Sequence, residues 1–113
     1  MLSPANRLRT SKDFALTTKT GLRATSHSLV LYFRTAEKLP SGPQVGLIIN
    51  KSVGGSVTRH RIARQLRHAI KEHLVNFPKN SQIVIRVLRD KPEFTNELSE
   101  LVTKLISKNP VKA

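Results

Sequence analysis

The chain has 113 residues, no cysteine, and twenty Lys and Arg side chains against seven Asp and Glu, which gives a net charge of +13. This length predicts a single domain over residues 1–113, with a flexible tail at 109–113. The absence of cysteine excludes disulfides, thiolate metal sites and cysteine nucleophiles. No apolar run approaches the roughly 20 residues that span a bilayer. The first twelve residues lack the apolar segment of a secretory signal, which predicts a cytoplasmic protein.

The positive charge is concentrated in one part of the chain. Residues 1–89 hold sixteen Lys and Arg and three acids, whereas residues 90–113 hold four of each. This segregation indicates a surface that faces a polyanion, and nucleic acid is the first candidate. A membrane surface is a weaker candidate, because binding there needs apolar residues beside the basic ones on an amphipathic helix.

The N-terminal third predicts one helix and a hairpin. The serine that opens residues 11–20 is expected to cap a short helix, and Gly21 to end it. Residues 28–34 are rich in β-branched and aromatic side chains, which predicts a strand, and residues 22–27 are its expected hairpin partner. The segment 37–43, which contains proline and glycine, is expected to be a loop.

The rest of the chain predicts two strands and two helices. Residues 44–50 have the composition of a strand, and residues 82–88 are apolar enough to form a central one. Ser56 is expected to cap a long helix that reaches about Val75. Residues 95–108 predict a last amphipathic helix, whose apolar face consists of Leu98, Leu101, Val102 and Leu105. This order predicts one α+β domain with a mainly antiparallel sheet.

The long helix has two contrasting faces. At about 100° per residue, Ile62, Leu66, Ala69, Ile70 and His73 fall on one arc. The opposite arc carries the side chains of His60, Arg61, Arg64, Arg67, His68 and Lys71. An ordinary solvated face mixes acids and bases, because oppositely charged pairs four residues apart stabilise a helix. Glu72 is the only acid in this helix, so its crowded arginines indicate a phosphate-binding surface.

Several motifs occur in a characteristic order. The central ones are Val45-Gly-Leu-Ile-Ile-Asn-Lys51, Val53-Gly54 and Val57-Thr-Arg-His-Arg-Ile-Ala-Arg-Gln-Leu-Arg67. They are preceded by Asn6-Arg-Leu-Arg9, Asp13-Phe14, Gly21 and Leu29-Val-Leu-Tyr32. Together these motifs resemble the bacterial ribonuclease P protein component, and the similarity covers approximately residues 5–108.

The resemblance implies a fold and a function. The implied fold is an α-β-β-β-α-β-α sandwich with a mixed, mainly antiparallel four-stranded sheet and a left-handed crossover through the arginine-rich helix. The implied function is to assist a catalytic RNA subunit that removes the 5′ leader of precursor tRNA, so no catalytic residue is expected in the protein. Magnesium is expected to be held mainly by that RNA. The expected partners are the ribonuclease P RNA and precursor tRNA, with no membrane and no obligatory protein partner.

The resemblance also implies roles for individual residues. Those expected to bind the RNA subunit are Arg59, His60, Arg61, Arg64, Arg67, His68, Lys71, Lys51 and Asn50. Those expected to line a cleft for the leader are Phe14, Tyr32, Arg34, Gly46, Ile48 and Asn50. Further RNA contacts are expected at Asn6, Arg7 and Arg9. Strand alternation is consistent with the cleft, because Val30, Tyr32 and Arg34 share one face and the side chains between them are of core type.

Some positions leave alternatives open. His60 stands where the family prefers asparagine, Ala63 replaces a frequent basic residue, and Thr18 stands where relatives often carry an aromatic side chain in the leader cleft. For Phe14, plain core packing is an equal alternative to a leader contact. For Tyr32, which is near Arg34, a leader contact is the favoured interpretation.

Other functions are less consistent with the sequence. A nuclease that uses two histidines is disfavoured, because His60 and His68 lie two helical turns apart, roughly 12 Å. The acids at 90–100 are interpreted as a solvated helix and its approach. A helix-turn-helix DNA reader is disfavoured by the presence of at least three strands. The main alternative is a non-catalytic protein that binds structured RNA, such as a ribosomal protein, which has a similar size and charge.

Overall fold

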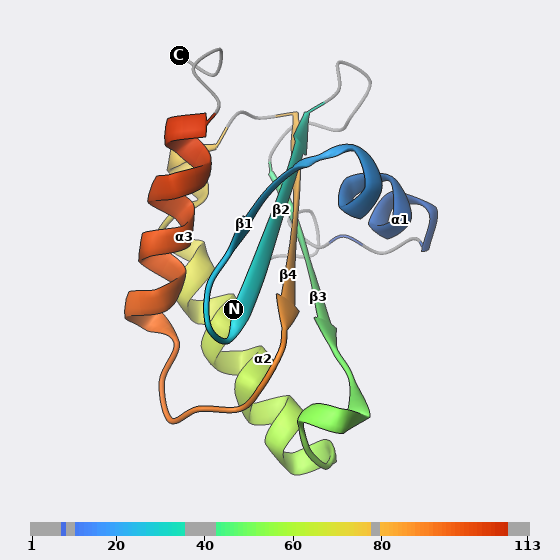
Figure 1. Cartoon of the computed structure of the whole chain (residues 1–113), viewed down its shortest axis with the longest axis vertical. Helices are drawn as coiled ribbons and strands as arrows, with labels where there is room; N and C mark the ends of the chain where they lie inside the picture. The colour runs from blue at the N-terminus through green and yellow to red at the C-terminus, as the bar shows by residue number, and fades with distance from the viewer. Residues whose placement is uncertain (1–7, 9–10, 36–42, 78–79, 109–113) are drawn as a thin grey trace.

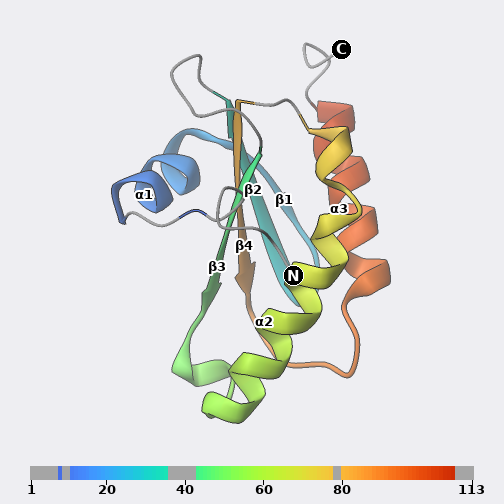
Figure 2. The same ribbon diagram turned by 180° about the vertical axis from the view of Figure 1, so that it is seen from behind.

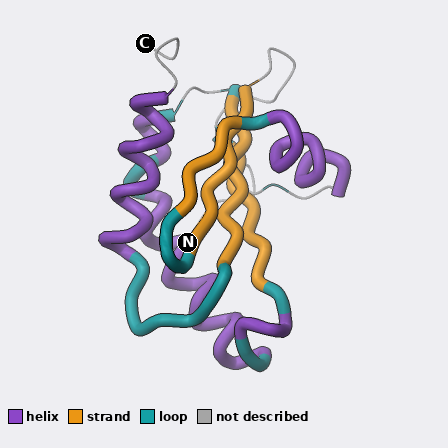
Figure 3. Tube along the Cα trace, in the orientation of Figure 1, coloured by secondary structure: helices purple, strands orange, loops and turns teal. Residues whose placement is uncertain are grey.

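The computed structural model describes residues 8, 11–35, 43–77 and 80–108. It confirms the expected α+β architecture, in which three α-helices flank one four-stranded sheet (Figures 1 and 3). The predicted RNA contacts at Asn6, Arg7 and Arg9, most of the 37–43 loop and the 109–113 tail lie outside the described residues. None of the described helices has both the length and the apolar character needed to cross a bilayer.

The elements follow the expected order along the chain. The α-helices are α1 (Ser11–Thr20), α2 (Ser56–Lys71) and α3 (Thr95–Lys108). The strands are β1 (Leu22–Thr25), β2 (Leu29–Thr35), β3 (Gln44–Ile49) and β4 (Ser81–Val87). Two short 3₁₀ segments flank α2, with η2 (Lys51–Val53) before it and η3 (Leu74–Asn76) after it.

Gly21 ends α1 as predicted. Its N–H donates to the carbonyl of Thr17 at 3.0 Å. A Cβ atom at this position would lie 2.5 Å from the carbonyl oxygen of Phe33, which is backbone and has no room to move aside. Glycine therefore allows the chain to pass closely over β2 as it leaves α1 and enters β1.

Two predictions about the ends of α2 are wrong. Ser56 is the first residue of the helix, and Gly55 occupies the cap position without a side-chain hydrogen bond. The helix ends at Lys71, four residues before the predicted Val75. It ends there because the N–H of His73 bonds to the carbonyl only three residues back, at 2.9 Å, and the tightened backbone continues into η3.

The sheet has the strand order β1-β2-β4-β3. β2 pairs antiparallel with β1 and with β4, whereas β3 and β4 are parallel. The predicted hairpin is confirmed, with Arg23 opposite Tyr32. β4 is a central strand, as its apolar composition predicts.

The parallel neighbours β3 and β4 are connected through α2. In Figure 2, α2 lies in front of the sheet, both strands run downward, and β4 lies to the right of β3. This arrangement is a left-handed crossover, whereas about 98% of such connections are right-handed. The unusual topology implied by the family resemblance is therefore present.

The main core lies between the sheet and the pair α2 and α3. The sheet contributes the alternate residues Leu29, Leu31 and Phe33 of β2 and Ile83, Ile85 and Val87 of β4. Helix α2 contributes Ile62, Leu66, Ala69 and Ile70, and α3 contributes Leu98, Leu101, Val102 and Leu105. All these positions are buried, so the predicted apolar faces of both helices are confirmed.

A second, smaller cluster lies on the opposite face of the sheet, beneath α1. It contains Leu8, Val30, Tyr32 and Val84, with Phe14 and Ile48 packed against it. Gly46 makes room for the ring of Phe14, because a Cβ there would lie 2.4 Å from its Cζ atom. The N–H of Leu8 also donates to the carbonyl of Val45 at 2.8 Å, which ties this segment to the edge of β3.

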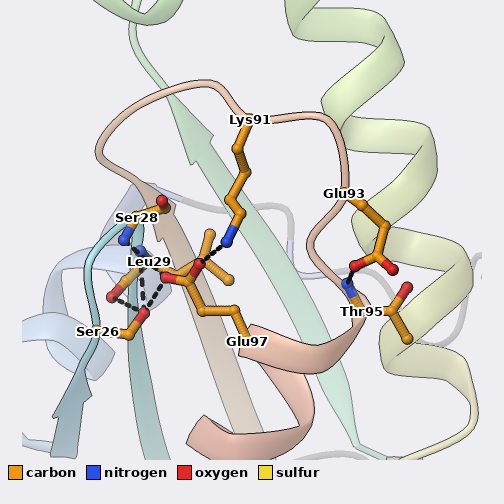
Figure 4. Close-up of polar contacts among 7 residues, drawn as sticks. All are labelled: Ser26, Ser28, Leu29, Lys91, Glu93, Thr95 and Glu97. Carbon is orange, nitrogen blue, oxygen red and sulfur yellow. Dashed lines mark hydrogen bonds and ion pairs between the residues drawn. The ribbon is translucent and has the colours of Figure 1, made fainter.

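A buried carboxylate joins α3 to the hairpin. Glu97 points from the first turn of α3 toward the turn between β1 and β2 (Figure 4). It accepts hydrogen bonds from the Ser26 hydroxyl, from the N–H of Ser28 at 2.6 Å and from the ammonium of Lys91 at 2.7 Å. Burial alone would raise the pKa of Glu97, but these donors outweigh it and lower the pKa from 4.5 to about 2. The interpretation of the acids at 90–100 as solvated is therefore wrong for Glu97.

Candidate RNA-binding surfaces

The cationic face of α2 points away from the main core. Because the four apolar residues of this helix are buried against the sheet, the opposite arc is turned outward. His60, Arg64, His68 and Lys71 are exposed, and Arg61 and Arg67 are half-buried. We call these six residues the basic stripe. The remaining histidine of the helix region, His73, is half-buried, and its Nε2 lies 3.2 Å from the Ser99 hydroxyl, as expected for a structural histidine.

The charges of the basic stripe are largely uncompensated within the protein. Arg61 has one carboxylate partner, since its Nη2 lies 2.6 Å from Oδ1 of Asp90 in the loop after β4. Arg64, Arg67 and Lys71 form no ion pair with any carboxylate among the described residues. Neighbouring cations on one helix face repel one another. A polyanion that binds here relieves this repulsion.

The stripe is also hollowed at its middle. A depression there is lined by His60, Ala63, Arg64, Arg67 and His68. Ala63, which departs from the family's frequent basic residue, is the small side chain in this set, so it leaves space between the longer cations. A second hollow lies between α2 and the start of α3, where Arg64 and His68 face the two acids Glu72 and Glu93.

The N-terminal end of α2 adds to the positive surface. Asn50, just before η2, and Lys51, its first residue, are exposed, and Arg59 is half-buried, with its Nε donating to the carbonyl of Gly54 at 3.2 Å. The first turn of α2 contains no acid. Free N–H groups at a helix N-terminus attract anions, so this end of the protein suits phosphate.

The residues predicted to line the leader cleft are only partly brought together. Phe14, Tyr32, Gly46 and Ile48 meet beneath α1. Tyr32 is only 7% exposed, while Phe14 and Ile48 are half-buried. Arg34 and Asn50 lie at opposite ends of this sheet face, since Arg34 is opposite Gln82 at the start of β4 and Asn50 follows the end of β3.

Arg34 takes part in a polar row across the sheet. Its Nη2 donates to Oε1 of Gln82 at 2.5 Å, and the Thr17 hydroxyl of α1 donates to the same oxygen at 3.3 Å. The Nε2 of the fully buried Gln82 donates to Gln44 at 3.1 Å. This row fixes α1 over one end of the sheet, so Arg34 has a structural role whether or not it also contacts RNA.

The family model described as Ribonuclease P matches residues 2–108. The chain belongs to the ribonuclease P protein family. It is 43% identical over 90 residues to the ribonuclease P protein component of Mycobacterium ulcerans, which covers 78% of this chain and 75% of that protein. It is 41% identical over 93 residues to that of Corynebacterium diphtheriae, with 78% of each chain covered. The chain is thus a bacterial ribonuclease P protein subunit, part of the ribonucleoprotein that cleaves precursor tRNA.

Solved structures show the same ribonuclease P protein fold. The protein from Staphylococcus aureus superposes with a TM-score of 0.71 at 19% identity, covering 96% of this chain and 98% of that one. The protein from Thermotoga maritima gives a TM-score of 0.62 at 22% identity, covering 94% of each chain. The ribosomal-protein alternative is therefore not supported.

The ribonuclease P motifs did not reveal the roles of one residue of β4, Arg86, and of the residue just after the strand, Leu88. Arg86 is exposed although β4 is central, and Leu88, just after the strand, is 41% exposed. Both share the parity of Val84, and Arg86 lies opposite Val30 and Ile48. They therefore belong to the same sheet face as Tyr32. Alternation along residues 82–88, applied to β4 as it was to the other strands, would have found them.

Proposed function

We propose that the basic stripe binds the RNA subunit of ribonuclease P, together with Arg59, Lys51 and Asn50 at the start of α2. The observation that carries this proposal is the exposure of Arg64 and Lys71 without a carboxylate partner in the described part of the chain. Guanidinium groups bind phosphate oxygens in a two-pronged manner, which suits the backbone of a folded RNA.

The sheet face beneath α1 is proposed to receive the 5′ leader of precursor tRNA. Phe14 offers a half-buried ring at the border between α1 and the sheet, and extended single strands bind proteins by stacking on such rings. The two surfaces lie on opposite sides of the sheet and approach each other at the end where β3 leads through Asn50 and η2 into α2 (Figure 1). An RNA subunit on α2 and a leader on the sheet would therefore come close to each other at this end.

In this proposal the complex acts in the cytoplasm and the RNA holds the catalytic magnesium. The side chains on the basic stripe are cations and imidazoles, and those on the sheet face are apolar, amide or cationic. Magnesium prefers carboxylate oxygens, and among the described residues no three His, Asp or Glu side chains gather as a metal site. In this proposal the protein's contribution is to bind and position RNA.

Reconstitution tests the first surface. The protein alone is expected not to cleave precursor tRNA, and with ribonuclease P RNA at low magnesium it is expected to stimulate cleavage. Replacing Arg64 and Arg67 by Ala should remove most of that stimulation, whereas Lys104→Ala on the exposed side of α3 should not. Full stimulation by the double variant would contradict the assignment of the stripe.

Substrate binding by the reconstituted holoenzyme tests the second surface. Phe14→Leu is expected to weaken precursor tRNA binding about tenfold, given the usual contribution of base stacking, with little effect on mature tRNA. Phe77→Leu is the matched control, since this ring packs at 5.3 Å from Phe33 in the main core and away from the leader face. Equal losses for precursor and mature tRNA with Phe14→Leu would contradict the leader site.

A further inference from the structure

The sheet face beneath α1 continues beyond the part that α1 covers. In Figure 1, α1 lies beside the upper half of the sheet, where β3 and β4 begin, and no described helix covers the lower half of that face. The strand register places Val30, Arg86 and Ile48 in one row of this lower half, one row beyond Tyr32, Val84 and Gly46. Val30 is buried, Ile48 is half-buried, and Arg86 and Leu88 are exposed; we call Ile48, Arg86 and Leu88 the open face.

Arg86 has an unusual position for an arginine. Its neighbours in the row are the apolar Val30 on β2 and Ile48 on β3, and Leu88 follows it on the same face. It is exposed, and its guanidinium group forms neither an ion pair nor a hydrogen bond with the other described residues. A mainly antiparallel sheet can leave part of one face in contact with water, and here that part is bordered by apolar side chains. The guanidinium group of Arg86, which is surrounded by apolar side chains, is therefore available to bind an anion.

Aromatic stacking is limited on this face. Tyr32 is 7% exposed beneath Leu8 and Phe14. Thr18, at the position where the family often has an aromatic side chain, donates its hydroxyl to the carbonyls of Phe14 and Ala15 within its own helix. Phe14 is then the main ring left for a leader base, and charge must supply more of the binding than stacking does.

We propose that Arg86 binds a phosphate of the 5′ leader on the open face, so that this chain holds the leader through its backbone charge more than through its bases. The proposal rests on the leader site proposed above and extends it by one row, about 6.7 Å along the strands. A strand that passes Phe14 and crosses Arg86 then reaches Asn50 and Lys51 at the end of β3. Its path stays on apolar, amide or cationic side chains.

The test combines a protein variant with leaders that carry one uncharged linkage. Methylphosphonate groups replace single phosphates at successive leader positions, each in its own precursor tRNA. Binding to the reconstituted holoenzyme is measured for wild type, Arg86→Gln and Arg86→Lys. Arg86→Gln is expected to weaken binding of the unmodified precursor about five- to tenfold, as for the loss of one typical hydrogen bond, and Arg86→Lys to restore part of this loss.

One leader position is expected to report the contact directly. At that position the uncharged linkage should weaken precursor binding by the wild-type holoenzyme by a similar factor. It should have little further effect on binding by the Arg86→Gln holoenzyme, because both changes remove the same interaction. Lys104→Gln, which removes one charge from the exposed side of α3, should show no such coupling. Replacing leader bases by abasic sites near this position should cost less than neutralising the phosphate.

Two results would overturn the proposal. One is the absence of any leader position at which the linkage and Arg86→Gln are coupled. The other is an equal loss for precursor and mature tRNA with Arg86→Gln. Phe14→Leu separates this outcome from failure of the leader site as a whole. If only the role of Arg86 is wrong, Phe14→Leu still weakens the binding of precursor tRNA more than the binding of mature tRNA.

Discussion

The carboxylate of Asp90 contacts the guanidinium group of Arg61 at 2.6 Å, and Arg61 is the one member of the basic stripe with a carboxylate partner among the described residues. Both side chains keep about two fifths of their surface exposed, at 38% and 41%. An ion pair this open contributes at most about 1 kcal/mol to stability. It nevertheless places one negative charge beside a surface that we propose to bind phosphate, where it competes with RNA for Arg61.

Asp90→Asn is therefore expected to strengthen RNA binding. Removing the carboxylate should raise the affinity for ribonuclease P RNA about two- to fivefold at low salt, with a change of less than about 1 kcal/mol in the free energy of unfolding. Filter binding at several salt concentrations, with thermal denaturation alongside, checks both parts. A weaker complex would show instead that Asp90 orients Arg61 for RNA, and the competition would be disproved.

Arg64→Ala combined with Arg67→Ala is expected to change the salt dependence of RNA binding. If each guanidinium neutralises one phosphate, the slope of log affinity against log salt should flatten by about 1.5 to 2. The measurement is a salt titration of binding to the RNA subunit. Lys104→Ala serves as the control, and an unchanged slope in the double variant would place the RNA on another surface.

Gly46→Ala is expected to displace the ring of Phe14. The new methyl group would lie 2.4 Å from Cζ of Phe14 and 3.1 Å from Cβ of Leu8. Because the half-buried ring is able to swing outward, the cost should be about 1 kcal/mol of unfolding free energy, at the low end for overpacking. Precursor tRNA should bind more weakly, while mature tRNA is unaffected.

Gly55→Ala is the matched control for that substitution. A Cβ at Gly55 meets no atom within 4 Å, although Ala is less favourable than Gly at a helix N-cap by about 0.5 to 1 kcal/mol, so precursor binding is the measurement that separates the two variants. Urea denaturation and precursor binding are measured for both variants. Equal stability and equal precursor binding of the two variants would show that the position of the Phe14 ring does not depend on the space above Gly46.

Glu97 makes folding stability depend on acidic pH. Its pKa is lowered from 4.5 to about 2 in the folded protein, so the folded state favours the ionised form more than the unfolded state does. The resulting stability is fully present above about pH 5 and is lost as the pH falls from there toward 2. Its size is at most about 3 kcal/mol, from the width of the shift.

Denaturation at pH 7 and at pH 3 checks this dependence. Glu97→Gln should be less stable than wild type at pH 7, and the difference between the two proteins should shrink at pH 3. Glu100→Gln, on the exposed side of the same helix, should behave as wild type at both values. A difference for Glu97→Gln that stays constant with pH would exclude the carboxylate as its cause.

Periodicity and turn residues were sufficient to predict most of the fold. The 3.6-residue pattern in α2 identifies its buried face correctly, and the alternation in β2 identifies the face that joins the main core, although Val30 and Tyr32 on the other face are buried as well. The end of α2 was not predictable, because it depends on η3 and on the contact of His73 with Ser99, 26 residues away. The Ser56 cap failed because the residue before it, Gly55, takes the extended cap conformation itself.

The candidate site was less predictable than the fold. Local sequence shows that α2 has a cationic face, but it does not show that Asp90 reaches Arg61 from a loop 29 residues away. The burial of Tyr32 likewise depends on Leu8, which is held beside β3 by a backbone hydrogen bond. Arg86 lies in an otherwise apolar strand, and its role in binding could be inferred only from the strand register, which places it beside Val30 and Ile48.

The hydrogen bond from Leu8 to Val45 also bears on how the protein tolerates proteolysis. β3 is an edge strand, and an uncovered edge is a template for pairing with another chain. Loss of Leu8 would remove the backbone hydrogen bond to Val45 and one of the side chains that pack on Tyr32 and Val84. A trimmed protein would then combine impaired substrate recognition with a tendency to self-associate through β3, so loss of activity and aggregation should arise together from a single nick.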